Sequence, residues 1–182
     1  MSSTEDQGRK EALLNAEEDG ASRTFAYDTG EGEAWWWFGV LATIKATEEQ
    51  TGGRNTLVEI LAPDGYESVL HVHHHEDEGF YILEGEMTFH AGDQTIKARP
   101  GSFLFGPKDV PHAFRVDSGP AKLLFVFTPA GFEGLIREMG ERARSLTVLP
   151  QPEAPPDEAE MERLAAIAAR YGAEILGPLP NQ

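Results

Sequence analysis

Residues 65–85 read GYESVLHVHHHEDEGFYILEG, and four of the chain's six histidines fall within five positions of this stretch. Side chains on a β-strand point alternately to opposite faces, so His71 and His73 would share one face while His74 points to the other. Two imidazoles on one strand face can reach the same metal ion. If the strand continues, His75 shares that face too, and His73 with His75 is an alternative pair.

A carboxylate and a third imidazole could complete such a site. Glu78 follows the histidine run after a turn, and His112 ends the segment PKDVPH at residues 107–112. Imidazole and carboxylate donors suit Fe, Ni, Co, Cu, Mn or Zn, and the order of intrinsic affinities does not choose among them. Four protein ligands would leave one or two coordination positions open, which a catalytic metal needs. The residues are compatible with one divalent transition metal as cofactor, and the alternative at this point is a polar, surface-exposed histidine run.

The composition narrows the classes of function. The 182 residues include no cysteine, so disulfides, thiolate metal sites and thiol nucleophiles are excluded. Lys and Arg total 15 against 31 Asp and Glu, a net charge of −16. Such acidity repels phosphate backbones and anionic lipid headgroups, so we expect no nucleic-acid partner and no membrane partner. Residues 1–10 lack the apolar core of a signal peptide, which predicts a cytoplasmic protein.

The chain divides into three zones. Residues 1–34 are polar and acidic, which predicts an N-terminal arm. Residues 35–130 contain short runs rich in Val, Ile, Phe and Leu between Gly and Pro turn signals, a pattern typical of an all-β sandwich or barrel. Residues 131–182 predict helices that pack on this barrel. An apolar helical periodicity starts at Phe132, and Asp157 is a candidate N-cap for a second helix.

The histidine stretch resembles the first conserved motif of the cupin superfamily. The match covers Gly65, five residues, His71-Val72-His73, four residues, Glu78, six residues and Gly85. Residues 101–112 resemble the second motif, except that Asp109 stands where glycine is usual; beyond it, Val116 stands where asparagine is common. The resemblance implies a jelly-roll barrel, a double-stranded β-helix. It assigns the metal ligands as His71, His73, Glu78 and His112, a spacing that disfavours His75.

Other stretches resemble bacterial single-domain cupins similar to quercetin 2,3-dioxygenases, among them residues 35–39, 76–85 and 128–132. This likeness implies a metal-dependent dioxygenase that uses O2 to open the ring of a flavonol-like, enolisable aromatic substrate, with release of carbon monoxide. Glu78 would be both ligand and proton acceptor, its pKa raised by partial burial and lowered by the metal. The alternatives are a cupin isomerase, decarboxylase or other oxygenase acting on a small polar molecule, or a non-catalytic metal- or ligand-binding cupin.

Aromatic and aliphatic side chains are predicted to line a substrate pocket beside the metal, although each could also be ordinary core. They are Phe80, Ile82 and Phe114, which alternate with the ligands along the strands, and Phe103 and Phe105, which share one strand face. An apolar pocket suits a flat aromatic ligand and O2 better than a sugar phosphate. The first C-terminal helix could pack outside the barrel or close its mouth.

Three consecutive tryptophans cannot all face one core, because side chains alternate along a strand. Trp36 must point away from Trp35 and Trp37, so at least one of the three is expected to cover a second apolar surface. Candidates for that surface are the C-terminal helices and a subunit interface. Cupins of this type are often dimers, and we therefore expect a homodimer.

Overall fold

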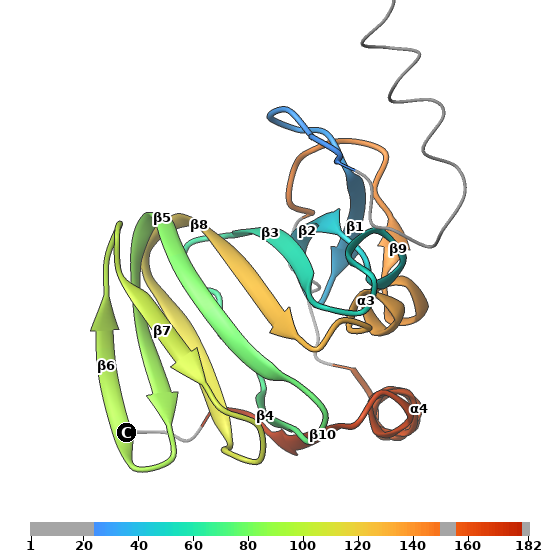
Figure 1. The fold of residues 1–182 in the computed structure, drawn as a ribbon. Helices are drawn as coiled ribbons and strands as arrows, with labels where there is room; N and C mark the ends of the chain where they lie inside the picture. The colour runs from blue at the N-terminus through green and yellow to red at the C-terminus, as the bar shows by residue number, and fades with distance from the viewer. Residues whose placement is uncertain (1–23, 150–155, 180–182) are drawn as a thin grey trace, which may run out of the picture.

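The computed structural model describes residues 24–149 and 156–179, and antiparallel strands dominate it (Figure 1). The strands are β1 Glu33–Trp37, β2 Val40–Ala46, β3 Thr56–Ala62, β4 Leu70–His73, β5 Asp77–Ala91, β6 Gln94–Ala98, β7 Phe103–Gly106, β8 His112–Thr128, β9 Glu141–Arg142 and β10 Ala173–Gly177. The helices are α2 Glu48–Thr51, α3 Glu133–Met139 and α4 Glu158–Arg170. The predicted all-β fold with C-terminal helices is confirmed. Residues 1–23 of the predicted N-terminal arm lie outside the described residues.

The strands form one connected sheet that curves around the core. Its order is β10-β4-β8-β3-β2-β1-β9, and β5 pairs with β6, β7 and β8. The first part of β5 pairs with the end of β8, and its last part pairs with the start of β8. Register shifts separate the two parts, where Gly85 has a φ of +81° and a Cβ would lie 2.8 Å from the Cα of Ala121. The turn signal at Gly85 therefore marks a bulged bend within a continuous strand.

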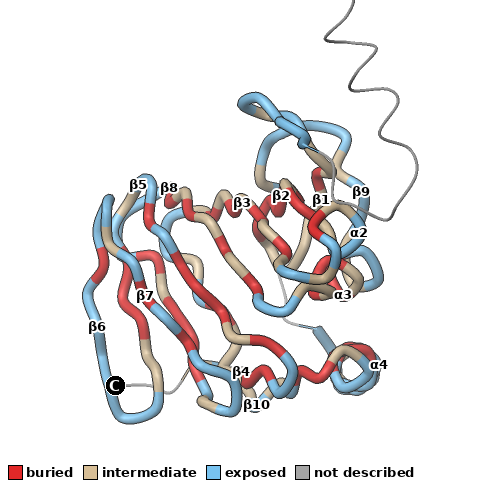
Figure 2. Tube along the Cα trace, viewed as in Figure 1, coloured by how far each residue is buried: buried red, intermediate tan, exposed pale blue. Residues whose placement is uncertain are grey.

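Buried residues recur at alternate strand positions and fill the barrel interior; they are coloured red along the trace in Figure 2. Val58 and Ile60 of β3 are completely buried, while the adjacent Leu57 and Glu59 are partly exposed. Removing this apolar surface from water is the main force that stabilises the barrel. The ring of Phe127 stacks on that of Phe132, with centroids 3.9 Å apart, and so joins β8 to the segment that enters α3.

The C-terminal residues add two helices and a strand beside β4. Asp157 caps α4 as predicted, because its side chain accepts a hydrogen bond from the Glu160 N–H at 2.9 Å. The following strand, β10, was not predicted; it pairs with β4 and places Ala173 opposite His73. β4 is therefore held between β8 and β10, and α3 lies against α4 at this edge of the barrel. None of the helices in the described ranges is long and apolar enough to cross a membrane.

The three tryptophans alternate along β1 as predicted. Trp35 and Trp37 pack against the hydrophobic core. Trp36 points the other way, and its Nε1–H donates to the carbonyl of Thr147 at 2.8 Å. Trp36 therefore contacts the chain segment that follows β9.

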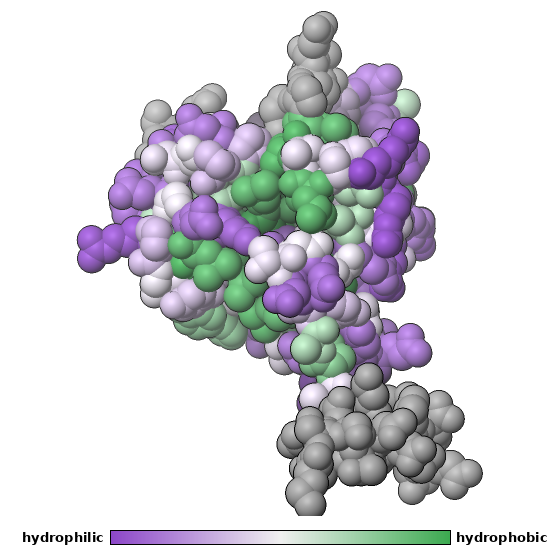
Figure 3. All heavy atoms as spheres, turned by 90° about the horizontal axis from the view of Figure 1, so that it is seen from above, coloured by the Kyte–Doolittle hydropathy of each residue, from purple (hydrophilic) through white to green (hydrophobic). Residues whose placement is uncertain are grey.

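The surface is mixed in character despite the acidity of the chain. Figure 3 looks down on the end of the molecule that is uppermost in Figure 1. Apolar residues gather in the middle of that face, and hydrophilic residues border them.

Candidate metal centre

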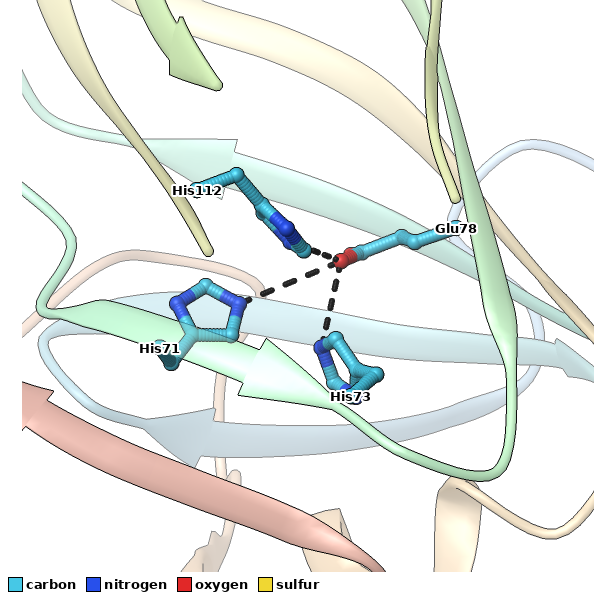
Figure 4. A group of neighbouring side chains, drawn as sticks. All are labelled: His71, His73, Glu78 and His112. Carbon is cyan, nitrogen blue, oxygen red and sulfur yellow. Dashed lines mark hydrogen bonds and ion pairs between the residues drawn. The ribbon is translucent and has the colours of Figure 1, made fainter. Parts of the chain in front are cut away.

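Three strands bring His71, His73, Glu78 and His112 together (Figure 4). β4 carries His71 and His73, β5 carries Glu78, and β8 begins at His112. His71 lies opposite His112 in the pairing of β4 with β8. One ligating atom from each side chain lies within 4.8 Å of the others, so the four predicted residues share one site.

The three imidazoles point their Nε2 atoms at the same carboxylate oxygen. Oε2 of Glu78 lies 3.0 Å from Nε2 of His112, 3.3 Å from Nε2 of His73 and 3.9 Å from Nε2 of His71. Glu78, His73 and His112 are buried, whereas His71 is partly exposed. The cluster is thus enclosed on most sides and open on the side of His71.

The opposite nitrogens of two rings fix their tautomers. Nδ1 of His71 lies 2.8 Å from the carbonyl oxygen of Val69, and Nδ1 of His112 lies 2.9 Å from that of Val110. A carbonyl oxygen can only accept, so each Nδ1 carries the proton when its ring is neutral and each Nε2 keeps its lone pair. This is the arrangement that a metal-binding histidine needs.

Buried polar atoms without partners show that these residues fit a metal ion. Among the described residues, both ring nitrogens of His73 and Oε2 of Glu76 are buried with no hydrogen-bond partner. Burying such atoms unsatisfied is unfavourable. A divalent cation bound between the three Nε2 atoms and Glu78 would satisfy the Nε2 of His73, and this donor set is one that transition metals prefer.

The cluster shifts the pKa values of its own members. Burial alone would raise the pKa of Glu78, but its hydrogen bond to His112 and the nearby rings of His71 and His73 hold it well below its usual range. Burial lowers the pKa of His71. Burial acts in the same direction on His73, yet Glu76 and Glu78 outweigh it and raise its pKa to about 9. Burial thus acts on the pKa of Glu78 in the predicted direction, but the three histidines outweigh it and stabilise the ionised form.

A cavity of about 420 Å³ opens beside the cluster. His71, His73 and Glu78 form part of its wall. Met139 of α3 and Met161 of α4 form another part, so the helices enclose the cavity as well as packing on the barrel.

Only two of the five predicted pocket residues line this cavity. Phe80 and Phe114 do, but Ile82 is fully buried in the core and does not reach the cavity wall. Phe103 and Phe105 are 62% and 58% exposed, so their predicted role in the pocket is wrong. The reason is the pairing register of β7, which places Gly106 opposite Glu78. Residues opposite each other point to the same face, so Gly106 faces the interior. By strand alternation, Phe105 and Phe103 then point to the outside of the barrel.

The cavity also has polar residues that the sequence interpretation missed. Asp64, Tyr66 and Glu67 flank Gly65 in the loop before β4 and line the cavity. The ring of Tyr66 packs against Phe114 with centroids 5.7 Å apart, and burial raises the pKa of its hydroxyl. Tyr66 therefore stays a neutral hydrogen-bond donor. Only one feature of the sequence indicates that these residues line the site, their position next to Gly65 of the first motif. A loop has no side-chain periodicity from which the direction of its side chains could be predicted.

His74 and His75 do not join the cluster, because β4 ends at His73 and the strand alternation stops there. His75 is exposed, which removes the alternative ligand pair. Nδ1 of His74 lies 2.7 Å from Oδ1 of Asp109. Asp109 has a φ of +64°, which explains why glycine is usual at its position in the second motif.

Comparison with known proteins agrees with the fold. Residues 57–127 match the family model described as Cupin domain. A quercetin 2,3-dioxygenase of Bacillus subtilis (strain 168) is 35% identical over 132 residues, which are 72% of this chain and 39% of that protein. The chain thus spans about two fifths of the length of that relative.

Two solved structures show the same fold at low sequence identity. KdgF from a Halomonas species has a TM-score of 0.53 and 16% identity, over 61% of this chain and 97% of that one. An RmlC-like cupin from Shewanella frigidimarina has a TM-score of 0.52 and 20% identity, over 63% of this chain and 99% of that one.

Proposed function

This chain belongs to the cupin superfamily, and on that premise we propose that it is a metal-dependent dioxygenase that opens the ring of a flavonol-like substrate with O2. The observation that carries the proposal is the placement of His71, His73 and Glu78 in the wall of an apolar cavity. Such a site lets a ligand contact the metal and the apolar wall at once. The likeness to a quercetin 2,3-dioxygenase supports the same reaction class.

The cavity favours a neutral aromatic substrate. Its volume of about 420 Å³ is in the range that holds a small organic molecule. Phe80, Phe114 and Phe125 form an aromatic wall beside the cluster. Of the described residues that line the cavity, none is lysine or arginine, and Asp64 and Glu67 are acidic. A phosphate or carboxylate substrate would meet these acidic side chains and find no basic side chain to bind it.

The reaction assigns separate tasks to metal and protein. A divalent transition metal at the cluster would bind the deprotonated hydroxyl of the substrate and promote its reaction with O2. Glu78 would accept the hydroxyl proton, and Tyr66 would donate a hydrogen bond to a substrate oxygen. The two C–C bonds to the hydroxyl-bearing carbon break, the two atoms of O2 bond to the flanking carbons, and the central carbon leaves as carbon monoxide. The cavity walls exclude water from these steps.

Aerobic incubation of the metal-loaded protein with quercetin tests this proposal. We expect the flavonol absorption to bleach with uptake of one O2 and release of one carbon monoxide per substrate. His112→Ala, which lacks a proposed ligand, is the control and should show neither. Metal binding without bleaching or gas exchange would rule out the flavonol. Turnover of a small polar molecule would then indicate an isomerase, decarboxylase or other oxygenase, and no turnover at all a binding protein.

We also propose that two copies of the chain pair through the outer aromatic face, defined as Tyr81, Phe103 and Phe105. These side chains lie on the outside of β5 and β7 and are 41%, 62% and 58% exposed. At about 200 Å² per aromatic side chain, they offer on the order of 300 Å² per copy. That is between a third and two fifths of the ~800 Å² that a standard interface buries on each partner, so these side chains would form its centre.

The outer aromatic face is uncharged, so two copies can meet there without bringing like charges together. Two chains with a net charge of −16 repel each other over most of their surface. Further along the sheet, Glu59 of β3 is neutralised by Lys122 of β8, with 3.2 Å between Oε1 and Nζ. An apolar centre bordered by a neutral pair is the composition typical of a dimer interface.

Sedimentation of Phe103→Glu/Phe105→Glu tests the pairing. We expect the unchanged chain to sediment as a dimer and the double variant as a monomer, because each copy would add two charges at the centre of the contact. The variant Ile96→Glu, at an exposed position on β6, is the control and should remain dimeric. A monomeric unchanged chain, or a double variant that still dimerises, would disprove this interface.

A further inference from the structure

Glu76 is a buried carboxylate that the proposed ligand set does not use. It lies in the turn between β4 and β5 and is only 4% exposed. Its Oε2 has no hydrogen-bond partner. Within the described residues, the one basic group that pairs with this carboxylate is Nδ1 of His73, at 3.7 Å. Because a buried charge is unfavourable unless it is compensated, the position of Glu76 needs an explanation.

Glu133 is a second buried glutamate, and hydrogen bonds to its carboxylate explain its burial. Oε1 of Glu133 accepts from the Glu48 N–H at 2.6 Å. Its Oε2 accepts from the Thr56 hydroxyl and from the Gly131 N–H, the latter at 3.2 Å. These donors tie α2, β3 and the start of α3 together. In the part of the chain that the structure describes, Oε2 of Glu76 has no such donor, so linking backbone segments does not account for its burial.

The three histidines of the cluster differ in the group that lies next to their Nδ1 atoms. His71 and His112 each face a neutral backbone carbonyl through Nδ1. His73 faces the Glu76 carboxylate instead. A group that accepts the Nδ1 proton fixes the ring and makes Nε2 a stronger donor to a metal, and a carboxylate does so more strongly than a carbonyl.

We propose that Glu76 is a positioning residue of the metal centre, whose carboxylate accepts the Nδ1–H of His73 and holds its Nε2 toward the metal. The inference rests on the proposed metal site. The separation of 3.7 Å would shorten when a cation draws the Nε2 lone pair and makes Nδ1–H a stronger donor.

Charge balance supports the same role. A divalent cation with Glu78 alone leaves a net charge of +1 in a buried site. Glu76 brings the sum to zero, because it adds a second negative charge beside His73. In a medium of low polarity, neutral groups of charges are much less costly to bury than charged ones. Glu76 should therefore raise the affinity for a divalent cation without contacting it.

Metal titration of Glu76→Gln, with Asp77→Asn as matched control, tests the proposal. Both changes remove one negative charge from adjacent residues, but Asp77 faces the Lys108 N–H at 2.9 Å and not a histidine. Metal-free proteins are titrated with Co²⁺ and Zn²⁺ against a competing chelator. We expect about 10–100-fold weaker binding for Glu76→Gln. Asp77→Asn should lose less than about threefold, because that charge is partly exposed and screened.

The Co²⁺ absorption spectrum separates positioning from ligation. It should keep its band positions in Glu76→Gln, because the four ligands are unchanged. Equal affinity in the two variants, or a shifted spectrum that shows a lost ligand, would overturn the proposal. Glu76→Asp keeps the charge but withdraws the carboxylate by one methylene, and its affinity should fall between those of Glu76→Gln and the unchanged chain. If the unchanged chain binds no metal at all, the proposed function fails and this inference fails with it.

Discussion

The inner and outer faces of β5 and β7 are built from the same strands and serve different purposes. On the inner face, Glu78 and Phe80 are buried in the wall of the cavity, and Glu78 belongs to the cluster with the three histidines. On the outer face, Tyr81 and Phe103 stand opposite each other and are exposed. Inner residues are fixed by packing and by each other, while outer residues have few restraints. Alternation separates the faces, but only the pairing register decides which residues face inward.

The largest expected effect is at the inner face. His112→Ala should lower metal affinity by more than about 100-fold, because even a residue behind a ligand contributes ~10–100-fold. Nε2 of His112 lies 3.0 Å from Oε2 of Glu78, which makes it the nearest of the three histidines to that oxygen. Metal content measured by elemental analysis, with circular dichroism to show that the barrel is folded, checks this.

His75→Ala is the matched control for that comparison. His75 is exposed and lies outside the cluster, although the sequence places it in the same histidine run. This variant should bind a full equivalent of metal. Loss of metal from His75→Ala, or its retention by His112→Ala, would show that the ligand assignment is wrong.

Replacing one buried and one exposed phenylalanine compares how much the inner and outer faces contribute to the free energy of unfolding. Phe127 is fully buried and stacks on Phe132, so Phe127→Ala should lower the free energy of unfolding by about 3–5 kcal/mol. Phe105 is 58% exposed, and Phe105→Ala should change that free energy by less than about 0.5 kcal/mol in the monomer. Urea unfolding at low protein concentration measures both, and similar losses would remove the distinction between the faces.

Protein concentration adds a second test of the outer face. If Phe105 lies in a dimer interface, its loss lowers the unfolding midpoint only at concentrations where dimers form. A cost of Phe105→Ala that does not depend on concentration would mean that the side chain packs within its own chain.

Local spacing together with the resemblance to two family motifs was enough to predict which four residues cluster. His71 and His73 are two residues apart on one strand, and the two sequence motifs supplied Glu78 and His112. The N-cap at Asp157 was also readable, because capping depends on neighbouring residues alone.

Features that depend on distant pairing could not be predicted. The sequence shows that Phe103 and Phe105 share one face of a strand. Which face this is depends on the pairing of β7 with β5, in which Phe105 lies opposite Gly79. β10 was missed because its pairing with β4 joins residues about a hundred positions apart. Glu76 was missed because strand alternation ends at His73 and says nothing about a turn.

The smallest effect on stability is expected for a polar cluster on the outside of the barrel, formed by Asp117, Thr88, Lys97 and Arg115. Asp117 of β8 accepts a hydrogen bond from Thr88 and pairs with Lys97 at 3.0 Å and with Arg115 at 2.8 Å. Burial opposes the shift, but these partners lower the pKa of Asp117 to about 2. The pKa is ~3.9 in an unfolded chain, so the group stabilises the fold above pH ~4 and loses that effect as the pH falls through 2.

Asp117→Asn should therefore reduce the free energy of unfolding at pH 7 by about 1 kcal/mol, a value kept small because solvent screens the exposed pairs. The difference from the unchanged chain should shrink between pH 4 and pH 2, and at pH 7 it should shrink in 1 M salt. Unfolding in urea at pH 7, 4 and 2.5 measures it. A difference that grows on acidification would contradict the assignment. Acid sensitivity that persists in Asp117→Asn then comes from other groups with lowered pKa values, among them Glu78 and His71 at the inner face.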